Sequence, residues 1–260
     1  MGWWGADVVV GDQPLDRLGL AANDILDGFN ETLGRRPTRD EWGELFSAAL
    51  AAAGGDLLVR VELTFDAGLI RDVLRSQPVA LRLAFAAACA ERLLSGCEAR
   101  TPTIGEPWDA LRAALAEVWN VAEGRDSAEE ATLQTHSARC AGAIPPDQLP
   151  WTVELSYLTF AGNCVRNAVQ AAIGGPVESA VGAARVPFDA IEYWCWGDYE
   201  TTIAGDMKES MRRTLQLAEM TRQRRDLELV AELATAGERD RWRELRERAR
   251  AEGAVVWRNR

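Results

Sequence analysis

Residues 78–96 read PVALRLAFAAACAERLLSG, the most apolar segment of this 260-residue chain. Pro78 is suited to begin a helix. Apolar side chains then recur at helical spacing, at Leu81, Phe85, Ala88, Cys89 and Leu93. Alanine fills most of the remaining positions, and beyond Arg82 the charged exceptions are Glu91 and Arg92. A helix that is apolar nearly all round is expected in the middle of a bundle, so this segment predicts a helical core.

The flanking sequence extends this helical pattern in both directions. Apolar periodicity bounded by Gly, Pro and capping residues predicts further helices over residues 14–29, 38–50, 108–122, 127–143, 153–173, 177–184, 207–233 and 238–252. Pro187 is expected to separate the helix at 177–184 from an aromatic segment. Residues 57–65 alternate in polarity, which leaves open one short β element in the first 65 residues. The predicted fold class is therefore mainly α, a multi-helix bundle.

Three segments are predicted along the chain. Residues 1–75 form an N-terminal helical segment packed on the core, residues 76–205 a central helical bundle, and residues 206–260 charged C-terminal helices. Residues 207–260 contain 14 Lys+Arg and 10 Asp+Glu, out of 29 and 40 in the whole chain. The first 206 residues therefore carry a net charge of −15, within a total of −11. Such an acidic body repels nucleic acid and anionic membranes and attracts basic proteins, although solubility alone also favours net charge.

The cysteines and the N-terminus predict a cytoplasmic protein. Five cysteines occur, an odd number without a CxxC pair, and three of them (Cys89, Cys164 and Cys195) have apolar neighbours. This pattern is typical of buried, reduced thiols. The chain begins Met1-Gly2-Trp3-Trp4, without the basic region of a signal peptide, and no apolar run approaches the ~20 residues that span a bilayer.

The sequence predicts neither catalysis nor a cofactor. Its one histidine, His136, lies in a predicted helix next to Ser137, and adjacent helical residues point in different directions. One histidine and scattered cysteines give no zinc-ligand spacing. The chain also lacks the glycine spacings of phosphate-binding loops. We therefore expect a non-enzymatic protein with no cofactor and no metal.

An aromatic and acidic segment, residues 188–200, is the candidate partner-binding surface. Aromatic anchors surrounded by acidic groups suit the docking of a basic protein. The predicted partner-binding residues are Asp189, Glu192, Trp194, Trp196, Asp198, Tyr199 and Glu200. The alternative is that these aromatics fill a core while the carboxylates face water.

Two stretches resemble known families. Met1-Gly2-Trp3-Trp4-Gly5, followed by residues 11–19, resembles the opening of small uncharacterised bacterial proteins that begin Met-Gly-x-Trp-Gly, which implies no activity. Residues 81–94, followed by residues 108–124, resemble the helical immunity-protein family of bacterial polymorphic toxin systems, with its YjaG-type relatives, over residues 76–200. In that family an Ala-rich helix ends in Ala-Glu-Arg-hydrophobic-Leu and Pro follows, whereas this chain continues with Ser95-Gly96.

The second resemblance implies an all-helical bundle that neutralises a cognate toxin by binding it, and it transfers no catalytic residues. The leading hypothesis is therefore an immunity protein with a basic toxin domain as partner. The first alternative is a structural or regulatory protein that self-associates through residues 207–260. The second is an enzyme with an unfamiliar carboxylate site.

Overall fold

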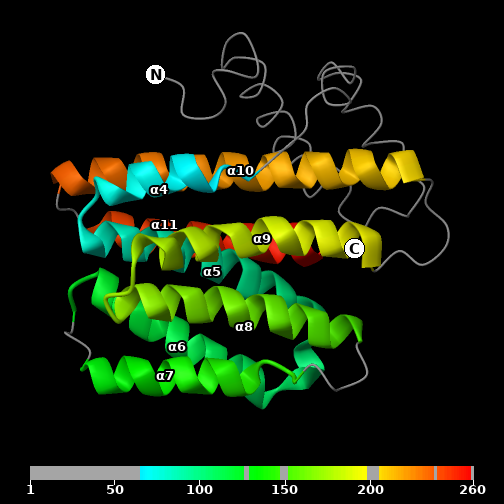
Figure 1. The fold of residues 1–260 in the computed structure, drawn as a ribbon, viewed down its shortest axis with the longest axis horizontal. Helices are drawn as coiled ribbons and strands as arrows, with labels where there is room; N and C mark the ends of the chain where they lie inside the picture. The colour runs from blue at the N-terminus through cyan, green and yellow to red at the C-terminus, as the bar shows by residue number, and fades with distance from the viewer. Residues whose placement is uncertain (1–64, 126–128, 147–151, 198–204, 237–238, 259–260) are drawn as a thin grey trace, which may run out of the picture. The chain divides into compact units, whose positions relative to one another are not determined.

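The chain folds into α-helices throughout the part that the computed structural model describes, which comprises residues 65–125, 129–146, 152–197, 205–236 and 239–258. These residues form eight α-helices, one short 3-10 helix and no strand, which confirms the mainly α prediction (Figure 1). Two predicted helices, at 14–29 and 38–50, lie outside the described residues. The predicted β element at 57–65 also lies outside them except for Phe65, which is not in a helix or strand. No described helix has the length and apolarity that crossing a bilayer requires.

The helices follow the predicted order closely. They are α4 (Ala67–Arg75), α5 (Val79–Arg100), α6 (Glu106–Ala122), α7 (Glu130–Ala143), α8 (Val153–Ala172), α9 (Val177–Gly197), α10 (Gly205–Ala236) and α11 (Arg239–Arg258), with the 3-10 helix η1 (Pro102–Ile104) between α5 and α6. Side-chain caps begin two of them: Asp66 accepts the Leu69 N–H at 2.8 Å, and Thr152 accepts the Leu155 N–H at 3.3 Å. The predicted start of the helix at residue 127 lies outside the described residues, and Glu129 is the N-cap of α7.

Two compact units make up the chain. Unit 1 comprises residues 1–65 and 191–224, and unit 2 comprises residues 66–190 and 225–260. Unit 2 therefore joins residues from all three segments that the sequence suggested, and it contains α4 to α8, the first part of α9, the last part of α10, and α11.

Helix α5 is the centre of unit 2. Residues 83–97 are buried without interruption. Helices α6, α8 and α11 all pack against this helix. Small alanine side chains let the neighbouring helices approach closely on several faces. The closest approach is at Gly253 of α11, where a Cβ atom would lie 2.9 Å from the Arg92 Cα. The prediction that this segment occupies the middle of a bundle is confirmed for unit 2.

The outer helices complete this unit. Helix α7 packs against α6 and α8, and Figure 1 shows it below α8. Trp119 of α6 is completely buried, and Trp108 nearly so, with its indole N–H donating to the Thr101 carbonyl at 2.9 Å. The tryptophans that the structure describes in α6 therefore serve the core.

Helix α9 corrects one sequence prediction, because it continues through Pro187. A proline inside a helix removes the N–H that would bond to the carbonyl four residues earlier, here that of Ala183. The Cys164 thiol of α8 lies 3.2 Å from the Ala183 carbonyl oxygen and donates to it. This contact partly satisfies the carbonyl that Pro187 leaves open, so the helix does not end at residue 184 as predicted.

Candidate functional site

The residues predicted to bind a partner are only partly brought together. Asp189 and Glu192 lie on α9; Glu192 is exposed, and Asp189 is half-exposed with its carboxylate 3.2 Å from the Arg185 guanidinium. Trp194 is buried, with 2% of its surface accessible, so it fills the interior as the alternative interpretation expects. Trp196 belongs to α9, but its side chain is outside the description, and Asp198, Tyr199 and Glu200 lie outside the described residues.

His136 and the cysteines offer no reactive pair in the described part of the chain. His136 is half-buried on α7, and Ser137 beside it instead accepts a hydrogen bond from Gln170 at 2.7 Å. All five cysteines are buried, and none of them forms a disulfide. Burial raises the pKa of Cys140 to about 11, against a smaller opposing effect of Arg166. Burial likewise raises the pKa of Cys97 far above its usual value, so both thiols stay protonated and unreactive.

A network of buried charges lies where α5, the end of α10 and α11 meet within unit 2. Asp226 of α10 is completely buried, and its carboxylate pairs with both Arg92 of α5 and Arg248 of α11, the latter at 2.7 Å. Arg92 is itself buried, and Glu252 of α11 lies 3.8 Å from its guanidinium. One carboxylate therefore holds arginines from two other helices, so this cluster ties three helices together.

Glu91 forms a second buried node of the same network. Its Oε1 atom accepts from Arg112 of α6 and from Arg250 of α11, each at 2.8 Å. Its Oε2 atom accepts the indole N–H of Trp119 at 3.2 Å. Three donors satisfy the hydrogen-bonding capacity of the buried Glu91 carboxylate. Glu91 and Arg92 therefore link α5 to the helices around it. Their role explains the two charges within the buried part of α5.

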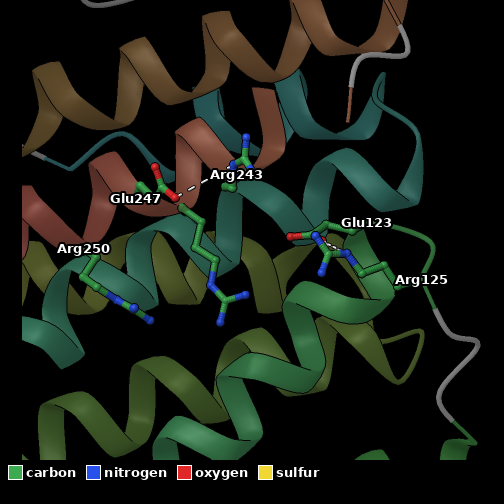
Figure 2. Close-up of a pocket in the computed structure, with 6 residues that line it drawn as sticks. Glu123, Arg125, Arg243, Glu247 and Arg250 are labelled. Atoms are coloured by element: carbon green, nitrogen blue, oxygen red, sulfur yellow. Dashed lines mark ion pairs between the residues drawn. The ribbon is translucent and has the colours of Figure 1, made fainter. Parts of the chain in front are cut away.

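A hollow rich in arginine opens beside this network. It has a volume of about 260 Å³ and lies between the C-terminal end of α6 and one side of α11. Its lining consists of four arginines and two glutamates: Glu123, Arg125, Arg243, Arg246, Glu247 and Arg250. Figure 2 shows Arg243, Glu247 and Arg250 along α11, and Glu123 with Arg125 beyond the end of α6. We refer to these six residues as the arginine hollow.

The two glutamates of the arginine hollow already have partners. Glu123 is almost buried and pairs with Arg125, and the Glu247 carboxylate lies 4.0 Å from the Arg243 guanidinium. The Arg246 guanidinium stacks over the Trp119 ring, 5.8 Å from its centroid, and pairs with no carboxylate in the described part of the chain. The hollow therefore keeps an excess of positive charge on an acidic protein.

The sequence did not single out this site. The arginines of α11 alternate with glutamates, a pattern that predicts an exposed, ion-paired helix face. Arg125 and Trp119 lie near the α11 arginines only because α11 packs beside the end of α6. Among the described residues, no group of three His, Cys, Asp or Glu side chains is placed to hold a metal ion.

The described part of the chain thus defines an all-helical protein with a buried charge network and an arginine hollow. No family model matches the chain, and no curated protein matches it. The chain is similar in structure to a solved protein, a DUF416 family protein from Shewanella baltica OS155. That likeness has a TM-score of 0.56 at 15% sequence identity and covers 72% of this chain and 94% of the other. At this identity the likeness concerns the fold alone.

Proposed function

We propose that this chain is a non-enzymatic bacterial protein that binds a basic protein partner and neutralises it, as an immunity protein does. The observation that carries the proposal is the net charge of −15 in the first 206 residues. A strongly acidic surface accelerates encounter with a basic partner and mimics the phosphate charge that a nuclease would bind. The resemblance of residues 76–200 to helical immunity proteins points the same way.

The proposed binding surface is centred on the carboxylates of α9. Glu192 is exposed, and Tyr193 beside it is half-buried, so a polar group and an aromatic ring are both within reach of a partner. Buried Phe188 and Trp194 hold the same helix in place. A rigid helix that presents charge loses little conformational entropy on binding. The proposal also includes Trp196, Asp198, Tyr199 and Glu200 among the partner-binding residues, on the basis of the sequence.

Self-association through residues 207–260 has less support. The apolar stripe of α11 includes Leu245 and Ala249, which are both completely buried, and α11 packs on α5 within unit 2. That stripe therefore already has a partner inside the chain. The proposal accordingly assigns α11 to the core and the partner surface to the acidic part of the protein. It places the protein in the reducing cytoplasm, where cysteines without disulfides persist.

Affinity capture from the native host tests the proposal. The tagged chain should retain one basic protein in a one-to-one ratio, and the yield should fall as salt rises, because screening weakens surface charge interactions. Substitution of the exposed Glu192 by Lys should slow association about tenfold, a change worth about 1.4 kcal/mol.

The matched control is Asp72→Lys, which reverses an equally exposed carboxylate on α4. It should leave the association rate within about twofold of the unsubstituted chain, since a charge outside the interface contributes mainly through the long-range field. Capture of an acidic partner, or equal slowing by both substitutions, would contradict the proposed surface.

A further inference from the structure

We propose that the arginine hollow is a binding site for a small phosphate-bearing anion, either free phosphate or a phosphate monoester. The proposal is independent of the protein-binding function, because the hollow involves α6 and α11 and none of the α9 carboxylates.

The charge of the hollow favours an anion. Its lining contains four guanidinium groups and two carboxylates, and the buried Glu91 carboxylate bonds to one of these arginines, Arg250, so four positive charges less three negative charges leave an excess of one. The C-terminal end of α6 adds a partial negative charge of about one half from its helix dipole. The excess remains positive, and the planar guanidinium groups suit phosphate oxygens in particular because each can donate two parallel hydrogen bonds.

Two guanidinium groups are positioned for this role before any ligand arrives. Arg250 is held by its Nε atom, which donates to the buried carboxylate of Glu91 at 2.8 Å, and no other described residue engages its terminal nitrogens. Arg246 is held by stacking on Trp119, whose ring is completely buried. Arginines with fixed side chains lose little entropy when they bind, and the planar guanidinium suits bidentate contact with phosphate oxygens.

Glu91 holds one side of Arg250 in place. Its carboxylate accepts from both Arg112 and Arg250, each at 2.8 Å, and Arg112 also pairs with Glu98, so these two carboxylates together balance these two arginines. Arg250 is also half-exposed, with 54% of its side chain accessible, and can present its terminal nitrogens to a ligand. Glu91 thus fixes the Nε atom of Arg250 and leaves the terminal nitrogens of this side chain accessible to a ligand.

The size of the hollow limits the ligand. A volume of 260 Å³ holds roughly nine water molecules at about 30 Å³ each. It is smaller than the ~300–1,000 Å³ of sites for drug-sized molecules. Phosphate with a small organic group fits this space, whereas a large cofactor does not.

Titration calorimetry of the full chain at constant ionic strength tests the site, with inorganic phosphate and ribose 5-phosphate as probes. Saturable one-site binding of either probe is expected. Tighter binding of ribose 5-phosphate would identify a phosphate ester as the ligand, and tighter binding of inorganic phosphate would identify the free anion. The absence of saturable binding for both probes in the low millimolar range would overturn the proposal.

Two substitutions and a control make the test specific. Arg246→Gln should weaken binding about tenfold, since a hydrogen bond to a charged group is lost, and Arg250→Gln should do the same. Arg185→Gln, which removes an exposed guanidinium from α9, should leave the affinity unchanged. If Arg250→Gln disturbs folding through Glu91, Arg246→Gln still decides the matter, because Arg246 has no carboxylate partner in the described part of the chain. Unchanged affinity in Arg246→Gln would refute the site.

Discussion

Replacement of Asp226 by Asn should strongly destabilise unit 2. The Asp226 carboxylate is completely buried and pairs with Arg92 and Arg248. Asn keeps the shape but loses the charge, and its amide NH₂ turns a donor toward one of the two guanidinium groups. Glu252, at 3.8 Å from Arg92, then remains to balance both arginines. Loss of one member of a buried ion pair costs about 3–5 kcal/mol.

Urea denaturation, followed by circular dichroism and tryptophan fluorescence together, measures this cost. With a denaturant dependence of about 3 kcal/mol per molar, the midpoint should fall by roughly 1–1.7 M. The matched control is Asp72→Asn, because Asp72 makes an exposed pair with Arg75 at 3.7 Å and its loss should cost less than about 0.5 kcal/mol. A double variant, Arg92→Met with Asp226→Leu, should recover much of the loss, since both buried charges leave together.

The reasoning would be refuted if Asp226→Asn cost no more than Asp72→Asn. That result would mean that water reaches the carboxylate and screens it, and that the buried network does not hold α5, α10 and α11 together.

Three further predictions concern packing, ionisation and binding. Gly253→Ala should lower the free energy of unfolding by about 1–3 kcal/mol, because the added methyl group meets the backbone of Arg92. A urea midpoint equal to that of the unsubstituted chain would contradict the close approach of the two helices. Cys140, with its pKa raised to about 11, should resist iodoacetamide at pH 8 in the folded chain and react once urea unfolds it. Because its folded pKa lies above the unfolded value near 9, its contribution to stability is complete below pH 9 and declines toward pH 11, which urea midpoints across that range can check. Glu192→Lys should reduce the salt dependence of partner association, measured by stopped-flow, and an unaltered salt dependence would exclude this residue from the interface.

Local pattern was sufficient to predict most of the described helices. The helices at 108–122, 153–173 and 207–233 were predicted to within three residues, and the last helix was predicted to begin at 238 but extends six residues beyond 252. Apolar spacing and Gly or Pro boundaries are local signals. The burial of residues 83–96 also followed from their apolar composition, whereas Val79 at the start of the same helix is exposed.

Long-range partners could not be predicted in the same way. Local rules predicted that the helix ends before Pro187, but α9 continues through it, and the Cys164 thiol of α8 donates to the Ala183 carbonyl there. Glu91 and Arg92 stood out as polar exceptions, but their partners lie up to 159 residues away. Trp194 was predicted as a surface anchor because an amphipathic segment does not reveal which of its faces is covered.

The arginine hollow also depends on contacts between residues far apart in the sequence, so it could not be predicted from local pattern. On α11 alone, arginines and glutamates at helical spacing describe a solvated face with internal ion pairs. The excess of positive charge arises only where α11 lies beside the end of α6 and Trp119 stacks under Arg246. The charged residues of such a site can be read from the sequence, but which of them lie together in the fold cannot.

Growth of cells that express the captured partner, with and without this chain, tests the central claim most directly. If the chain is an immunity protein, the partner alone arrests growth, and co-expression of the chain restores it through a one-to-one complex. A partner that does not impair growth, or growth arrest that persists although the complex forms, would contradict neutralisation by direct binding.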